Sequence, residues 1–180
     1  MFEKVNLSPL SITILTYLSR SPHKQFFLRK IARTTGSSVG GCHKVLKNMH
    51  KMSLIDKEKR GRNLYYKIND LNPAMKYFKI FINIQELNKL VKKIINECNK
   101  IILFGSCATG EDTLESDIDL LIITENFKEI KQLLKYKYIN DRKLKPIILS
   151  PHEFIKLKNR DRAFYEEVNK GIVLWRGSNE

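Results

Sequence analysis

The sequence has few of the features that mark secreted, membrane-spanning or metal-scaffolded proteins. Its apolar runs are all far shorter than the ~20 residues that cross a membrane, and its first four residues do not open a secretion signal. The three cysteines, Cys42, Cys98 and Cys107, are odd in number and widely spaced. Neither a disulfide framework nor a zinc ligand set is therefore expected, and the four histidines add no metal-ligand spacing. We expect a soluble, cytoplasmic protein with no membrane partner.

Acidic residues are also scarce. The chain of 180 residues has 33 Lys and Arg against 19 Asp and Glu, a formal net charge of +14. Residues 1–70 hold 14 of the basic residues against 4 acidic ones, whereas residues 71–180 hold 19 against 15. Because the positive charge is concentrated in the first segment, we expect an anionic partner there.

Residues 1–70 show three helical patterns followed by a hairpin pattern. Helices are expected over residues 9–18, 28–35 and 37–52, with a short edge strand at 26–28 and a hairpin that turns at Gly61. This order resembles the winged helix-turn-helix domains of prokaryotic regulators, and it rests on pattern rather than on a signature motif. We take residues 1–70 as this domain and residues 71–180 as a second one, with 71–99 as a helical connector and first helix that are separated by a break at Asn83-Ile84. A further helix is expected over residues 126–137, and a third strand of the second domain over residues 145–149.

The resemblance implies double-stranded DNA as a partner, since the third helix of such a domain enters the major groove. The residues expected to contact DNA are Ser37, Ser38, His43, Lys44 and Lys47 around this helix and Arg60 and Arg62 at the hairpin tip. Two alternatives stay open: the lysines are an ordinary solvated surface of a lysine-rich chain, or the winged helix is a protein-interaction module.

The second domain contains the most informative stretch of the chain. Residues 101–104 are a short apolar run that predicts a buried strand, and it stops at Gly105-Ser106 before an expected short helix. A strand, a Gly-Ser turn and a helix start together favour phosphate binding. Asp117 and Asp119 then open a second apolar run, and side chains two apart on a strand share one face. Mg²⁺ prefers such oxygen ligands and usually takes one or two carboxylates with substrate phosphates.

The run from Phe104 to Leu121 resembles the signature of polymerase-β-like nucleotidyltransferases, and within them the minimal nucleotidyltransferases of prokaryotes. The alternative is a surface turn followed by an acidic strand start. The resemblance implies that Gly105 and Ser106 bind a nucleoside triphosphate (ATP in the first instance), and that Asp117 and Asp119 are catalytic and bind Mg²⁺ or Mn²⁺. Together, the two resemblances imply an α+β fold: a winged helix domain followed by a small α/β nucleotidyltransferase domain with a mixed sheet.

The sequence departs from that family on the expected third strand. Active members place a third carboxylate there, which helps bind metal and accepts the proton of the attacking hydroxyl. Here the matching region contains Lys145-Pro146 and no acid, with Asp141 upstream and Glu153 downstream. The reaction is then slow, or borrows a base from elsewhere, or is lost.

Two functions follow, and the first is favoured. In one, the protein transfers a nucleoside monophosphate to a hydroxyl of a protein or small molecule, with a partner toxin of a toxin–antitoxin pair among the expected acceptors. In the other, it is a transcriptional regulator whose catalytically silent nucleotidyltransferase fold binds a nucleotide or a partner. A homodimer is a further expectation.

Overall fold

The computed structural model describes residues 7–135 and 138–177. The chain divides into two compact units, residues 1–77 and 78–180. This division falls inside helix α4 (Pro73–Ile94), whereas the boundary expected at residue 70 precedes that helix. In the described ranges, no helix combines the length and the apolar character needed to cross a membrane.

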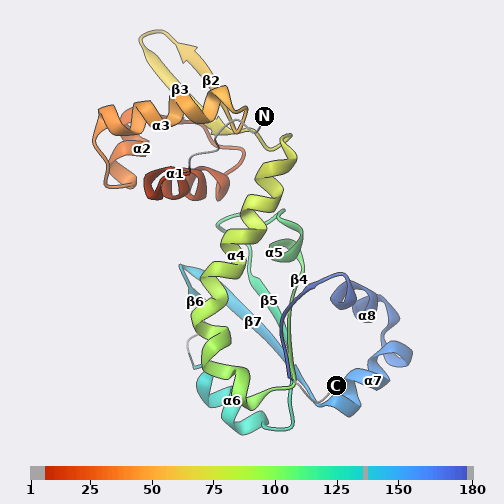
Figure 1. Ribbon diagram of the computed structural model, residues 1–180. Helices are drawn as coiled ribbons and strands as arrows, with labels where there is room; N and C mark the ends of the chain where they lie inside the picture. The colour runs from red at the N-terminus through yellow and green to blue at the C-terminus, as the bar shows by residue number, and fades with distance from the viewer. Residues whose placement is uncertain (1–6, 136–137, 178–180) are drawn as a thin grey trace, which may run out of the picture. The chain divides into compact units, whose positions relative to one another are not determined.

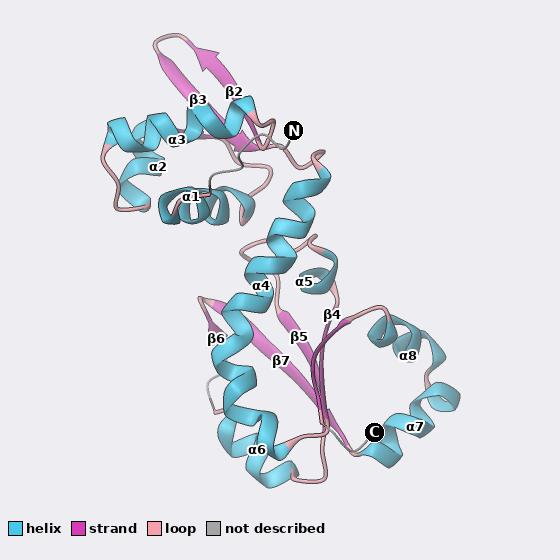
Figure 2. Ribbon diagram, in the orientation of Figure 1, coloured by secondary structure: helices cyan, strands magenta, loops and turns pink. Residues whose placement is uncertain are grey.

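The first unit is a winged helix: three helices and a three-stranded antiparallel sheet (Figures 1 and 2). Its elements are α1 (Pro9–Ser19), β1 (Phe26–Phe27), α2 (Leu28–Thr34), α3 (Val39–Lys51), β2 (Ile55–Arg60) and β3 (Asn63–Ile68). The sheet has the order β1-β3-β2. Two helices start where a serine oxygen accepts a backbone N–H: Ser8 from Ser11, and Ser38 from Gly41. The hairpin turns at Gly61, whose positive φ of 58° suits glycine.

Apolar residues at helical and strand spacing hold this unit together. Ile14, Leu15 and Leu18 of α1 pack inward with Ile31 of α2 and Leu46 of α3, all at most 1% exposed. Full burial of each such side chain contributes roughly 1.5–3 kcal/mol. The predicted order of three helices and a basic hairpin is thereby confirmed.

Helix α4 runs unbroken from Pro73 to Ile94 and is followed by a 3₁₀ turn, η1 (Ile95–Glu97). The sequence predicted a break at Asn83-Ile84, and that prediction was wrong. Asn83 is 1% exposed and its side-chain amide is hydrogen-bonded inside the second unit. A polar residue in the middle of a helical pattern suggests a break, and the sequence does not show the distant hydrogen-bond partners that allow the helix to continue.

The second unit is a five-stranded mixed sheet with helices on both faces. Besides the helix already given, its elements are β4 (Lys100–Phe104), α5 (Ser106–Thr109), β5 (Ile118–Ile123), α6 (Phe127–Leu133), β6 (Tyr138–Ile139), β7 (Arg142–Leu149), α7 (Pro151–Arg160), α8 (Arg162–Asn169) and β8 (Ile172–Arg176). The order is β6-β7-β5-β4-β8, and only β5 and β7 are parallel. The predicted α+β class with a mixed sheet is confirmed.

Two elements differ from the sequence-based expectation. Helix α6 ends at Leu133, although a helix was predicted to residue 137, and residues 136–137 lie outside the described ranges. Strand β7 starts at Arg142 rather than at Lys145, and it forms a hairpin with the short, unpredicted strand β6. The hairpin turn contains Asn140 and Asp141, both with positive φ.

The two faces of the sheet have separate cores. On one face, Ile101, Leu103, Leu120 and Ile122 pack with buried residues of α4 and α6. On the other face, Ile102, Phe104, Leu121 and Ile123 pack with Val168 of α8 and with Phe154 and Phe164 of α7 and α8. Figure 1 shows α4 and α6 on one side of the strands and α7 and α8 on the other. Because side chains alternate along a strand, Asp119 lies on the α7/α8 face with Leu121 and Ile123.

Candidate functional site

The turn after β4 requires glycine at position 105. Gly105 has φ 65° and ψ −156°, a combination that essentially only glycine adopts. A Cβ added there would lie 2.8 Å from Oδ2 of Asp119, closer than real Cβ contacts allow. The Asp119 carboxylate therefore lies directly against the backbone of the Gly105-Ser106 turn. Ser106 begins the single-turn helix α5 and is partly exposed.

The structure brings the two predicted carboxylates to this turn. Asp119 is opposite Phe104 in the antiparallel pair of β4 and β5, next to Gly105. Asp117 comes two residues earlier, immediately before β5 begins at Ile118. Both side chains are partly exposed, so a ligand can reach them from solvent. All four residues predicted for nucleotide and metal binding thus come together at the end of β4 and the start of β5.

Lys145 is the third charged group of the site. In the parallel pair of β5 and β7 it lies opposite Asp119. Its Nζ lies 2.6 Å from Oδ2 of Asp117, with the Lys145 and Asp117 side chains 53% and 32% exposed. The ammonium thus takes the place on β7 where the family resemblance leads one to expect an acid. We define Asp117, Asp119 and Lys145 as the charged triad.

Electrostatics distinguish the members of the triad. Burial raises the pKa of Asp119, the Lys145 charge opposes that rise, and the negative charges of Asp117 and Glu167 add to it. The pKa of Lys145 is raised by its hydrogen bond to Asp117 and then by the Asp117 charge. Glu167 belongs to α8, which covers the same face of the sheet. The sequence analysis missed it, and only its helical spacing beside the buried Val168 could have indicated it.

The carboxylates fit a divalent cation that arrives with a nucleotide. Mg²⁺ in proteins commonly takes one or two carboxylates and completes its coordination with substrate phosphates and water. Nowhere in residues 7–135 and 138–177 do three or more acidic, histidine or cysteine side chains gather in a way that could hold a metal. Asp117 and Asp119 would therefore hold Mg²⁺ or Mn²⁺ only together with phosphate oxygens. Oδ2 of Asp117 is already paired with the Lys145 ammonium group.

A buried polar cluster anchors the loop between the Gly-Ser turn and the carboxylates. We call it the Arg142 network: Lys79, Asn83, Glu86, Asp112 and Arg142. Arg142 donates to Oδ2 of Asp112 at 2.9 Å, to Oε2 of Glu86 at 2.7 Å and to Oδ1 of Asn83 at 3.0 Å. Asn83 donates to Oδ1 of Asp112, and Lys79 donates to the Asp112 carbonyl.

The network connects directly to the site. Asn83 donates to the carbonyl of Cys107 in α5, and the Cys107 thiol donates to the carbonyl of Asp117 at 3.3 Å. Asp112 and Arg142 are 0% and 2% exposed. The sequence analysis missed this network, because nothing local indicates that these polar residues are buried together.

The predicted DNA-contacting residues of the first unit are mostly exposed. His43, Lys44 and Lys47 lie on the solvent side of α3, opposite the buried Cys42, Leu46 and Met49. Ser38 caps the helix, and the Ser37 hydroxyl is bonded to that of Thr35 at 3.1 Å.

The two hairpin arginines differ. Arg60 is held by Glu58, with Nε to Oε1 at 2.6 Å, and it stacks over the Tyr65 ring at 5.5 Å. Arg62 lies exposed beyond Gly61. Of the two, Arg62 is therefore the better placed to reach an external phosphate.

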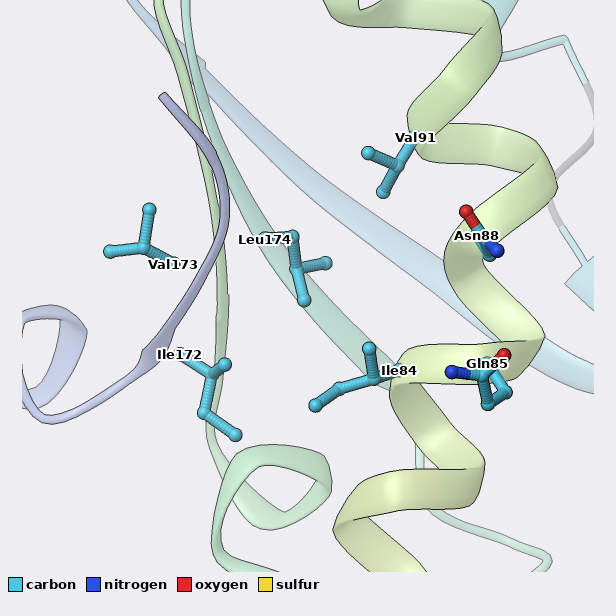
Figure 3. Close-up of a pocket in the computed structure, with 7 residues that line it drawn as sticks. All are labelled: Ile84, Gln85, Asn88, Val91, Ile172, Val173 and Leu174. Atoms are coloured by element: carbon cyan, nitrogen blue, oxygen red, sulfur yellow. The ribbon is translucent and has the colours of Figure 1, made fainter.

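A pocket of about 230 Å³ lies elsewhere in the second unit, between α4 and the edge strand β8 (Figure 3). Its lining is formed by Ile84, Gln85, Asn88, Val91, Ile172, Val173 and Leu174. None of these side chains is charged, and none belongs to the charged triad. The pocket's only polar side chains are the neutral amides of Gln85 and Asn88.

Comparison with known proteins agrees with this geometry. A family model described as a nucleotidyltransferase domain matches residues 83–170, which include the Gly-Ser turn, the charged triad and Glu167. A relative from Methanocaldococcus jannaschii, provisionally named a protein adenylyltransferase, is 36% identical over 95 residues, covering 51% of this chain and 94% of its own. The chain belongs to the nucleotidyltransferase domain family.

Two solved structures show distant similarity. A protein from Sulfolobus solfataricus, provisionally described as a nucleotidyltransferase, matches with a TM-score of 0.39 and 14% identity over 58% of this chain and 90% of its own. The archaeal chromatin protein TrmBL2, whose structure shows a mode of DNA binding, matches with a TM-score of 0.34 and 14% identity over 93% of this chain and 72% of its own. At these scores neither similarity informs function.

Proposed function

We propose that the second unit binds a nucleoside triphosphate with Mg²⁺ or Mn²⁺ and transfers its nucleoside monophosphate to a hydroxyl group. The observation that carries this proposal is the contact between the Asp119 carboxylate and the glycine-only turn at Gly105, with Asp117 beside it. In the transfer, the acceptor oxygen bonds to the α-phosphorus, the bond to the bridging oxygen breaks, and pyrophosphate leaves. The bound cation would neutralise charge on the phosphates.

Each residue of the site has a separate role in nucleotide binding and transfer. Gly105 lets the phosphate chain approach the backbone, and the Ser106 hydroxyl donates to a phosphate oxygen. Asp117 and Asp119 would hold the cation, which would supply charge neutralisation for the phosphates. We infer ATP as donor and a protein hydroxyl as acceptor, which agrees with the name of the 36% identical relative.

The acceptor must also lose a proton. A positioned base typically contributes ~10²–10⁴-fold in rate. Glu167 is one candidate, because it belongs to α8, which packs on the face of the sheet where Asp119 lies. Asp141 is the other, although it lies in the exposed turn before β7. A partner toxin as acceptor and a homodimer stay predictions.

Transfer is tested by incubating the protein with Mg²⁺ and α-labelled ATP, with and without the product of a neighbouring gene. We expect label on protein, and we expect Asp117→Asn with Asp119→Asn to abolish it. Glu167→Gln and Asp141→Asn tell the two candidate bases apart. Absence of labelling by the wild-type protein with every acceptor, while nucleotide still binds, would favour the silent regulator instead.

We further propose that the first unit binds double-stranded DNA through α3 and the hairpin tip. The exposed basic face of α3, with Lys44 and Lys47, supports this, and the excess of positive charge in residues 1–70 adds to it. Affinity should then fall steeply with salt, and each lost phosphate contact should flatten the log–log slope by about one. We expect this from Lys44→Ala, Lys47→Ala and Arg62→Ala.

Two control variants sharpen the DNA test. Arg60→Ala should have a smaller effect than Arg62→Ala, because Glu58 already neutralises Arg60. Lys128→Ala removes an exposed lysine from α6 in the second unit and should leave the slope unchanged. An affinity that does not depend on salt, or equal effects of Lys44→Ala and Lys128→Ala, would contradict DNA binding by α3.

A further inference from the structure

We propose that Lys145 binds the phosphate chain of the nucleotide, and that without nucleotide it occupies the carboxylates in place of the metal ion. Metal and nucleotide would then enter the site together rather than one after the other. This inference rests on the proposed function of the second unit and assigns a ligand-binding role to a residue on β7.

The position of Lys145 indicates that its ammonium group and a metal ion exclude each other at Asp117. Its place on β7 is fixed by the parallel pairing opposite Asp119. Its Nζ reaches past that register to Oδ2 of Asp117 at 2.6 Å. A cation bound by Asp117 through this oxygen cannot share the position with an ammonium group at such a distance. One of the two must leave when the other arrives.

The net charge of the triad differs between the ligand-free site and the site with bound nucleotide. Without ligand, one ammonium group against two carboxylates leaves the triad with a single negative charge, which attracts a divalent cation less than two would. A nucleoside triphosphate brings several negative charges to the same place. An ammonium group displaced from Asp117 then finds phosphate oxygens as its new acceptors, and a lysine is well suited to this role.

The freedom of the side chain permits this exchange. The Lys145 side chain is 53% exposed, and a lysine ammonium sits on a flexible four-carbon stem. An ion pair with this exposure contributes little to folding, so a purely structural role does not account for its position. The Gly105-Ser106 turn lies beside Asp119, so bound phosphates would come within reach of the same ammonium group.

The test compares Lys145→Met with a matched control, Lys143→Met. Lys143 is an exposed lysine two residues earlier on β7, on the same side of the strand. Binding of Mn²⁺ alone is followed by the electron paramagnetic resonance signal of the free ion. Binding of a non-hydrolysable ATP analogue with Mn²⁺ is followed by calorimetry. Fluorescence of Trp175 confirms that each variant is folded.

We expect two effects of opposite sign in the same variant. Lys145→Met should bind Mn²⁺ alone about tenfold more tightly, because a competing positive charge is gone. It should bind the nucleotide analogue about tenfold more weakly, because a charge-assisted phosphate contact is lost. Lys143→Met should match the wild type in both, and Lys145→Arg should keep both affinities near the wild type because it keeps the charge.

The outcomes separate this inference from the proposed function. If the wild type binds the analogue and Lys145→Met changes neither affinity, or changes both in the same direction, the inference is overturned and the proposed function stands. If the wild type does not bind the analogue even with Mn²⁺, both are overturned. Equal effects of Lys143→Met and Lys145→Met would overturn a specific role for Lys145.

Discussion

Replacing Asp112 by asparagine tests whether the Arg142 network holds the second unit together. The change keeps the shape of the side chain and removes its charge, which takes away the carboxylate that Arg142 and Lys79 share, while Arg142 keeps its ion pair with Glu86. Breaking a buried ion pair by removing one partner typically costs ~3–5 kcal/mol. With a urea dependence of about 2 kcal/mol per molar, the unfolding midpoint should fall by roughly 2 M.

The assay is urea unfolding followed by fluorescence. Trp175 is the single tryptophan of the chain and lies in β8, so its signal reports the second unit. Arg162 and Glu166 give a matched control: their ion pair is 2.8 Å long, close to the 2.9 Å of Arg142 and Asp112, but both side chains are exposed. Glu166→Gln should leave the midpoint nearly unchanged.

A second variant separates burial of charge from loss of shape. Arg142→Met combined with Asp112→Asn leaves no buried Arg142 charge. The double variant should therefore lose less free energy of unfolding than the two single variants lose when their losses are added. If Asp112→Asn lowers the midpoint no more than Glu166→Gln does, the Arg142 network does not hold the second unit together. The inference about the buried pair would then be refuted.

Three further predictions concern other residues. Gly105→Ala should weaken nucleotide binding measured by calorimetry by more than tenfold, since a Cβ there meets the Asp119 carboxylate and the backbone conformation excludes it; unchanged affinity would contradict the proposed turn. The pKa of Glu153 lies below its ordinary value, because the Ser150 backbone N–H and then the Ser150 hydroxyl donate hydrogen bonds to the Glu153 carboxylate. The carboxylate therefore stabilises α7 fully at pH values above the ordinary pKa of glutamate, and this stabilisation is lost as the pH falls through the lowered pKa. Ser150→Ala should raise this pKa in a carboxyl titration by nuclear magnetic resonance, and no change would refute the hydrogen bond between the Ser150 hydroxyl and Glu153. Burial, and then the Glu97 charge, raises the pKa of Cys98 to about 11, so its alkylation should stay slow at pH 8 and accelerate towards pH 11, unlike that of a free thiol.

Local chemistry made much of this fold readable from the sequence. The third helix was expected to open at Ser37-Ser38, and Ser38 is the residue that caps α3. Strand β4 ends just before Gly105, where the apolar run stops. The spacing of Asp117 and Asp119 placed both carboxylates on one face, because the period of a strand is two residues.

Long-range partners account for what the sequence did not show. Asn83 suggested a break in α4, yet its partners lie in α5, in the following loop and on β7. Nothing in the sequence around Arg142 marks it as buried in a chain so rich in basic residues, yet it is 2% exposed. The lack of an acid at Lys145 was readable, but its contact with Asp117 required the parallel register of β5 and β7.

The strand order also has a consequence for synthesis. Strand β4 is the first of its sheet to be made, and it lies between β5 and β8, the last. Until Ile172–Arg176 leaves the ribosome, one edge of the apolar strand Lys100–Phe104 has no neighbour, and such an edge invites pairing with another chain. The first unit closes its sheet with Ile68 and has no such delay. During translation the winged helix can therefore fold early, whereas the nucleotidyltransferase unit keeps an unpaired apolar strand edge until its last strand is made.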